Sequence, residues 1–187
     1  IDYDKITPDF LFIGKTLAAG YAPVSAVVTK KKFTDFIKLK LGAIQISTTH
    51  QGHSLGVAAA YAVQKIIHNE KFLQEVIHKG NYLRKTIYDE LKDHKFFKNI
   101  RGRGLRNSLE YNCNDKHLFG IALTDQAKSK ENLLISAKWH RVCFSPAINI
   151  SQNDLDKGLE KFLKSFKIVA SKWNSKNIKK IKNRHFF

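Results

Sequence analysis

The chain has 187 residues and a formal net charge of +17, with 33 Lys and Arg against 16 Asp and Glu. Its hydrophobic content of 43% is enough to build a core and excludes general disorder. The two cysteines, Cys113 and Cys143, are widely spaced, which argues against a disulfide framework or a zinc site and favours a cytoplasmic setting. No apolar run approaches the ~20 residues that cross a bilayer, so we expect no membrane partner.

The beginning of the chain is unusual. It reads Ile-Asp-Tyr-Asp, and there is no methionine at any position. We interpret the sequence as an incomplete chain, or as one from which methionines were omitted.

The basic residues are mostly Lys and are spread along the whole chain. Near the C-terminus they cluster without an intervening acid, at Lys172, Lys176, Lys179, Lys180, Lys182 and Arg184. A solvated lysine-rich surface is the preferred interpretation, so we expect no nucleic-acid partner. A basic nucleic-acid-binding module stays as the weakest of three hypotheses.

The first elements in chain order alternate between apolar runs and turn-prone loops. Residues 9–14 predict a buried strand of a parallel sheet, and residues 24–29 predict its neighbour. Gly20 and Pro23 break the loop between them. Residues 30–41 follow a helical pattern, and a polar loop over residues 45–53 leads to an Ala-rich helix that begins near Ser54.

A second helix is expected over residues 71–92, and after it the pattern changes to a mixture of strands and helices. The expected elements are strands over 96–104 and 105–111, a helix over 117–130, strands over 132–136 and 141–144, and a helix from Ser151 to about Lys172. Ser151 with Asp154 three residues later resembles a capping box, which predicts the start of the last helix.

Lys15 follows the first predicted strand directly and opens a loop of small residues. Partial removal from water disfavours the charged ammonium form of a lysine. The resulting neutral amine can attack an aldehyde and form a Schiff base. By position alone, a solvated surface lysine is the more common outcome.

A second candidate site lies just before the Ala-rich helix, in the polar run from Ser47 to His53. Hydroxyls and free backbone N–H groups near a helix start can bind phosphate, although an ordinary capping loop has the same composition. His50 and His53 lack a third ligand nearby, so we do not assign them to a metal.

Residues 7–26, Thr-Pro-Asp-Phe-Leu-Phe-Ile-Gly-Lys-Thr-Leu-Ala-Ala-Gly-Tyr-Ala-Pro-Val-Ser-Ala, resemble the Schiff-base segment of class-III aminotransferases. Further segments resemble later motifs of that family in the same order: Thr49-His50-Gln51-Gly52-His53, the Ala-rich run 58–64, Gly80 with Leu83 and Leu91, Ile100-Arg101-Gly102-Arg103-Gly104-Leu105 with Glu110, and Phe144-Ser145-Pro146-Ala147-Ile148. The details Gly20-Tyr21-Ala22-Pro23, Gly52-His53 and Val63-Gln64 are typical of its ω-amino-acid:pyruvate branch.

The resemblance implies an α/β chain: the end of a fold-type-I large domain followed by a smaller α+β domain. We expect residues 1–70 to belong to the cofactor-binding domain, 71–92 to form a linking helix, 93–172 to form the small domain and 173–187 to form a basic tail. The implied cofactor is pyridoxal 5'-phosphate. Lys15 would hold it, and Thr49 would hydrogen-bond its phosphate from the neighbouring subunit of a homodimer.

The implied reaction moves an amino group from an amino acid or amine to a 2-oxo acid through a Lys15 Schiff base. Family members often bind the substrate carboxylate with an arginine near the Pro-Pro turn, which makes Arg141 a candidate, and a surface strand arginine is an equal alternative. Arg101 and Arg103 are better explained as parts of the small-domain turn.

The sequence departs from the family pattern in three ways. Ser54 and Ala147 replace family prolines, and the acid, the stacking aromatic and the first phosphate-binding turn expected upstream of the lysine precede this chain's first residue. An inactive remnant of the same fold, acting as a binding or structural protein, is therefore the second hypothesis.

Overall fold

The computed structural model describes residues 5–45 and 48–173. Ser47 and all of the predicted basic tail except Trp173 lie outside the described residues. By its internal contacts the chain divides into two compact units, Ile1–Leu73 and Gln74–Phe187, called unit 1 and unit 2 below. Each unit is described by itself. None of the helices over the described ranges is both long enough and apolar enough to cross a membrane.

Unit 1 begins with a pair of antiparallel strands. Strand β1 (Phe10–Ile13) pairs with β2 (Ala26–Thr29), with Phe10 opposite Thr29 and Ile13 opposite Ala26. The predicted parallel arrangement of these two strands is wrong. Parallel neighbours need a crossover that returns the chain to the same end, usually a full helix. Residues 14–25 hold only the 3₁₀ turn η1 (Lys15–Ala18), so the chain simply reverses.

Two predicted helices complete unit 1, α1 (Lys31–Leu41) and α2 (Ser54–Ile67). The small residues of α2 allow it to lie close to the loop that follows β1. A Cβ added at Gly56 would be in ordinary van der Waals contact with Val24 Cβ at 3.6 Å, and Gln64 Nε2 donates to the carbonyl of Leu17 at 3.2 Å. Helix α2 therefore holds the backbone just after Lys15 in place.

Apolar side chains in unit 1 are mostly exposed. Among its described residues, those that are buried are Ala18, Ala22 and Gly56. The predicted burial of the first strand is wrong, because Phe12 is 78% exposed. The apolar face predicted for α1 is only partly covered: the Phe33 ring lies 4.8 Å from that of Phe10, centroid to centroid, and no residue of α1 is buried.

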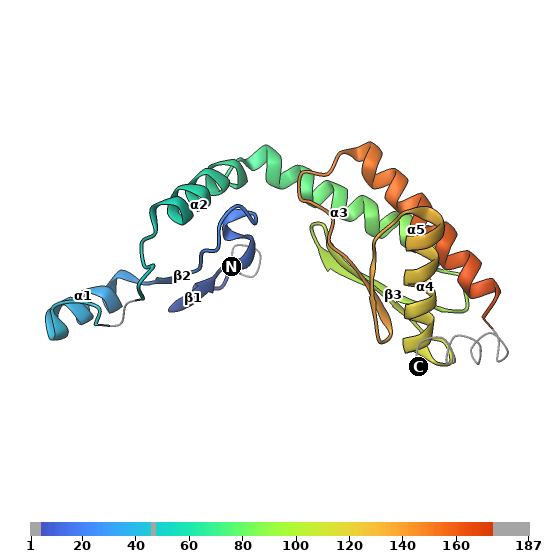
Figure 1. The fold of residues 1–187 in the computed structure, drawn as a ribbon, viewed down its shortest axis with the longest axis horizontal. Helices are drawn as coiled ribbons and strands as arrows, with labels where there is room; N and C mark the ends of the chain where they lie inside the picture. Colours follow the sequence, from blue (N-terminus) through green and yellow to red (C-terminus); the bar gives the residue numbers. More distant parts are fainter. Residues whose placement is uncertain (1–4, 46–47, 174–187) are drawn as a thin grey trace. The chain divides into compact units, whose positions relative to one another are not determined.

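Unit 2 is a four-stranded antiparallel sheet with helices packed against one face (Figure 1). Its strands are β3 (Phe97–Arg103), β4 (Arg106–Tyr111), β5 (Ser136–Lys138) and β6 (Arg141–Phe144), in the order β3-β4-β6-β5. Its helices are α3 (Glu70–Leu91), which starts in unit 1, α4 (Lys116–Glu131) and α5 (Gln152–Ser171).

The core of unit 2 lies between the sheet and the helices. Its fully buried members include Leu83, Ile87, Leu91, Leu109, Tyr111, Phe119, Leu123, Val142 and Phe166. The Phe119 ring lies 4.9 Å from Tyr111 and 5.6 Å from Phe166, centroid to centroid. Burial raises the pKa of Tyr111 well above its ordinary value, and its neutral hydroxyl lies 3.1 Å from the carbonyl of Lys116 and 3.2 Å from that of Trp139.

The start of α5 was predicted correctly, whereas the start of β5 was not. Ser151 caps α5 as predicted: its Oγ accepts the backbone N–H of Asp154 at 3.0 Å. The strand expected over residues 132–136 instead begins at Ser136. Asn132 adopts a left-handed conformation (φ 50) that ends α4, and the N–H of Leu133 returns to the carbonyl of Ala127.

Candidate functional site

Lys15 lies at the end of β1 in an uncommon backbone conformation. Its φ is 54, in the left-handed region that residues with a side chain seldom adopt. The N–H of Leu17 bonds to the carbonyl of Gly14 at 3.2 Å and closes the turn around Lys15. A Cβ at Gly14 would lie 3.3 Å from Ser25 Cβ, so this side of the turn is tight. The backbone of Lys15 is held by local packing rather than being part of a loose loop.

The side chain of Lys15 is exposed in this chain. The expectation that the strand end removes it from water is wrong for the residues that the structure describes. The physical reason is that few elements surround this part of unit 1. Strand β1 has one described neighbour, β2, and its residues alternate between exposed and partly buried. Further protein surface would have to cover Lys15 before solvent is excluded from its amine.

Thr49 lies in a turn before α2. The N–H of Gln51 bonds to the carbonyl of Thr48 at 3.0 Å, and Gly52 with φ 68 continues the turn. Thr49 itself is exposed, so its hydroxyl is open to a ligand. It belongs to the same unit as Lys15.

His53 is the capping residue that the sequence did not reveal. His53 lies one residue before the predicted helix start, and its Nδ1 accepts the backbone N–H of Gly56 at 3.3 Å. Histidine is not among the preferred capping residues, so composition gave no signal for this. His50 and His53 lie 6.2 Å apart, ring to ring, and no group of three metal-binding side chains occurs among the described residues.

Arg141 lies in unit 2, at the start of β6, and is exposed. In the sheet it stands directly opposite Glu110 of β4. Glu110 forms ion pairs with Arg101 Nη2 at 2.5 Å and Lys98 Nζ at 3.3 Å, and its side chain is 8% exposed. Burial opposes ionisation of Glu110, but the hydrogen bond from Lys98 and the charges of Arg101, Lys98 and His140 hold its pKa below the ordinary value.

The model of the aminotransferase class-III family matches residues 1–166 of this chain. The chain belongs to the class-III aminotransferases. Among its curated relatives are the ornithine aminotransferase of Plasmodium falciparum (isolate 3D7), 29% identical over 164 residues, and the mitochondrial ornithine aminotransferase of Arabidopsis thaliana, 32% identical over 163. These alignments cover 87% and 85% of this chain but 38% and 33% of the relatives.

Solved aminotransferase structures share the same arrangement. Acetylornithine aminotransferase from Elizabethkingia anophelis superposes with a TM-score of 0.79 at 25% identity, over 89% of this chain and 41% of its own. Ornithine aminotransferase from Toxoplasma gondii ME49 superposes with a TM-score of 0.80 at 26% identity, over 92% of this chain and 40% of its own. An omega-transaminase from Thermomicrobium roseum, at 18% identity and 0.80, shares the fold. This chain therefore has the mixed α/β architecture of part of a class-III aminotransferase and spans about two fifths of these structures or less.

The glycines of the Arg-Gly-Arg-Gly motif have a packing role in this aminotransferase chain. Gly104 (φ 47) begins the two-residue connection between β3 and β4, where Arg103 pairs with Arg106. Helix α3 approaches this turn so closely that a Cβ at Gly80 would overlap the carbonyl of Gly104. The turn is also tied by Asn107, whose Nδ2 donates to that carbonyl at 2.9 Å. The Arg84 guanidinium donates to Asn107 Oδ1 at 2.6 Å.

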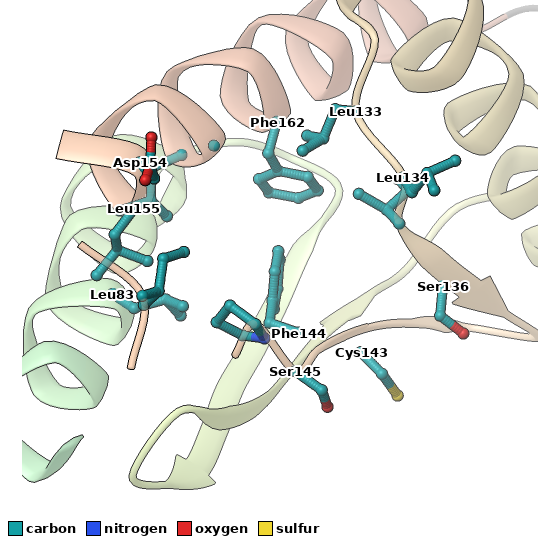
Figure 2. Close-up of a pocket in the computed structure, with 15 residues that line it drawn as sticks. Leu83, Leu133, Leu134, Ser136, Cys143, Phe144, Ser145, Asp154, Leu155 and Phe162 are labelled. Atoms are coloured by element: carbon teal, nitrogen blue, oxygen red, sulfur yellow. The ribbon is translucent and has the colours of Figure 1, made fainter. Parts of the chain in front are cut away.

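Unit 2 also contains an apolar cavity of about 570 Å³ that the sequence did not indicate (Figure 2). It lies between α3, the first half of α5 and the segments that precede β5 and follow β6, and its lining includes Leu83, Leu133, Leu134, Phe144, Leu155 and Phe162. Figure 2 shows Phe144 pointing toward Phe162, whereas the sulfur of Cys143 and the hydroxyl of Ser136 point away from them. The volume lies in the range of small-molecule pockets.

Proposed function

We propose that this chain supplies the lysine-bearing part and the small domain of a pyridoxal-phosphate-dependent aminotransferase. The reaction would move an amino group from an amino acid or amine to a 2-oxo acid. The observation that carries the proposal is Lys15, held in a fixed left-handed turn at the end of β1 in a chain that matches the class-III family over residues 1–166. Pyridoxal phosphate, when bound, supplies an electron sink for the substrate carbanion.

The residues present fit this cofactor in their chemistry. An accessible primary amine at Lys15 can hold an aldehyde, and its fixed backbone limits where the amine can reach. Once released, the same amine would take a proton from the substrate α-carbon as a base and donate it to C4′ of the cofactor as an acid. The exposed hydroxyl of Thr49 can donate a hydrogen bond to a phosphate.

A homodimer with active sites at its interface is part of this proposal. Unit 1 exposes large apolar side chains, with Tyr21 84% and Leu39 81% exposed, and contiguous exposed apolar surface marks interaction sites. A covering subunit would also exclude water from Lys15, as the chemistry requires. Thr49 would then reach the cofactor of the neighbouring subunit. A cytoplasmic location stays a prediction.

The assignment of parts follows the same logic. The cofactor-binding domain would include residues 1–70, and a helix over residues 71–92 would link it to the small domain. The small domain, residues 93–172, would contribute Arg141. Arg141 would bind the substrate carboxylate, which a guanidinium can hold with two parallel hydrogen bonds.

Cofactor capture by Lys15 is the direct test. The 187-residue chain is incubated with pyridoxal phosphate and reduced with borohydride, and the modified peptide is identified by mass spectrometry. We expect a stoichiometric pyridoxyl group on Lys15, lost in Lys15→Arg and kept in Lys40→Arg, which changes an exposed lysine of α1. Equal labelling of many lysines, unaffected by Lys15→Arg, would contradict the proposal.

Turnover distinguishes the enzyme from an inactive remnant. Amino transfer from ornithine to a 2-oxo acid is measured on the same preparation, because ornithine is named for several relatives. Capture with transfer supports the aminotransferase. Capture without transfer from ornithine, alanine or an ω-amino acid favours the remnant, a protein that keeps the fold and a binding role.

A further inference from the structure

The turn that carries Lys15 has a disfavoured backbone conformation at both of its ends. Lys15 has φ 54, and Ala19, the residue that ends η1, has φ 49. This left-handed region is unfavourable for any residue with a Cβ. Such a conformation persists only where the surrounding structure holds it. The Lys15 turn therefore depends on contacts from outside its own residues.

One of these contacts is a hydrogen bond from helix α2. Backbone N–H groups donate to three carbonyls of the turn, those of Gly14, Thr16 and Ala18. The carbonyl of Leu17 accepts the side-chain amide of Gln64, whose Nε2 lies 3.2 Å away. Because a carbonyl can only accept, the nitrogen of the amide is the atom that faces it. Gln64 thus supplies a donor to the turn two residues after Lys15.

Gln64 is the polar member of an otherwise apolar helix face. The less exposed residues of α2 recur at helical spacing and form one face: Gly56, Ala59, Ala60, Val63, Gln64 and Ile67. The amide of Gln64 is part-buried where it meets the Leu17 carbonyl. Burying a polar group is unfavourable unless it is hydrogen-bonded. The amide and the carbonyl therefore each stabilise the position of the other.

Helix α2 contacts the loop around Lys15 at two points. Near the helix start, a Cβ at Gly56 would lie 3.6 Å from Val24 Cβ, close to the end of the loop. About 12 Å further along the helix axis, the Gln64 amide bonds to Leu17, close to the beginning of the loop. Without the second contact, the side of the loop that carries Lys15 would lose its hydrogen bond to α2.

We propose that Gln64 is a positioning residue for Lys15. Its amide holds the left-handed turn through the Leu17 carbonyl and so limits where the Lys15 amine can reach. This role rests on the proposed function, in which Lys15 captures pyridoxal phosphate. Capture forms a C=N bond between the deprotonated amine and the aldehyde carbon and releases one water, and it is favoured when the amine is already in place.

Cofactor capture and amide exchange are measured on the same variants of the 187-residue chain. Gln64→Leu removes the donor at a similar volume, and Gln64→Glu, ionised at neutral pH, can only accept. Each should raise the pyridoxal phosphate concentration for half-maximal borohydride-fixed labelling of Lys15 by about two- to tenfold, the effect of one hydrogen bond. Without cofactor, each should also speed exchange of the Leu17 and Ala19 amides, which are hydrogen-bonded in the turn.

A second donor at the same position separates hydrogen bonding from packing. Gln64→Arg differs in shape but keeps N–H groups that can reach the Leu17 carbonyl, so both values should stay near those of the unmodified chain. A loss in Gln64→Arg as large as in Gln64→Leu would overturn the role of the donor. The matched control Gln126→Leu makes the same substitution at a partly buried position of α4 and should change neither value.

The two measurements distinguish a failure of this role from a failure of the proposed function. Equal labelling of Lys15 in the unmodified chain and in Gln64→Leu would overturn the positioning role and leave the proposed function standing. Unchanged exchange of the Leu17 amide in Gln64→Leu would show, without any cofactor, that Gln64 does not hold the turn. An unmodified chain that is not labelled at Lys15 would instead overturn the proposed function itself.

Discussion

The two units of this chain differ in how much of their apolar surface they bury. Unit 2 closes a core around Phe119 and Phe166, both fully buried, between a four-stranded sheet and its helices. Unit 1 has two short strands and two helices, and its described buried residues are two alanines and a glycine. Yet unit 1 carries Lys15 and Thr49, the two residues most closely tied to the proposed chemistry.

The difference indicates that the two units reach stability in different ways. Unit 2 has the sheet, the helices and the aromatic cluster of an independent domain. Unit 1 keeps its local hydrogen bonds, such as Gln64 to Leu17, but leaves large apolar side chains uncovered. Unit 1 therefore leaves the surroundings of Lys15 open to solvent, whereas unit 2 encloses its own apolar core.

The largest expected effect is the loss of a buried ring in unit 2. Phe166→Ala should lower the free energy of unfolding by about 3–5 kcal/mol, because it removes apolar contacts and leaves a cavity. Phe12→Ala in unit 1 should change the same transition by less than about 0.5 kcal/mol, since Phe12 is exposed. Both tryptophans lie in unit 2, so fluorescence during urea unfolding reports its transition. Equal costs would erase the contrast between the units.

A second contrast lies within unit 2, between two helical glycines. Gly80→Ala should lower the free energy of unfolding of unit 2 by about 1–3 kcal/mol. The new methyl overlaps the Gly104 carbonyl and forces α3 away from the turn. Gly158→Ala meets nothing within 4 Å and should stabilise α5 by up to about 1 kcal/mol through helix propensity. Urea unfolding of both variants gives the two signs. Stabilisation by Gly80→Ala would show that α3 does not contact the turn.

Helix caps give a smaller effect that again separates the units. Ser151→Ala should cost about 1 kcal/mol in the unit 2 transition, because the N–H of Asp154 loses its acceptor. His53→Ala removes the cap of α2 in unit 1 and should leave that transition unchanged. Its effect is expected in the amide hydrogen exchange of the first turn of α2. A shift of the unit 2 transition by His53→Ala would argue for one cooperative unit.

The smallest effect is a pH dependence at His94. Burial, and then the charges of Lys95 and Lys167, hold the pKa of His94 below its ordinary value of 6.5. The unfolded chain therefore binds this proton more readily. The stability that His94 contributes is present above pH 6.5 and is lost as the pH falls through the lower folded pKa.

In the unmodified chain the Phe96 N–H donates to His94 Nδ1 at 3.1 Å. The variant His94→Asn keeps an acceptor for this N–H and cannot titrate in this pH range. We expect its free energy of unfolding to fall less steeply than that of the unmodified chain from about pH 7 to about pH 5. The control His50→Asn, at an exposed position of unit 1, should leave the slope unchanged. Identical slopes for all three proteins would remove His94 as the cause.

Local patterns were sufficient for most helices and for the family. The apolar spacing over residues 71–92 predicted α3 within one residue at each end, and Ser151 predicted the start of α5. The ordered motifs around Lys15, Gly52 and Gly104 indicated the class-III aminotransferases, which the family match confirms. These features depend on residues close in sequence, whose preferences act before any tertiary contact is made.

Only the tertiary structure decided pairing and exposure. Strands β1 and β2 are antiparallel, none of their residues is buried, and Lys15 is exposed. The cavity beside Phe162 arises because helix packing brings together residues that are far apart in the sequence. Burial and cross-strand contact depend on which distant segments meet, and no local pattern in one chain encodes that choice.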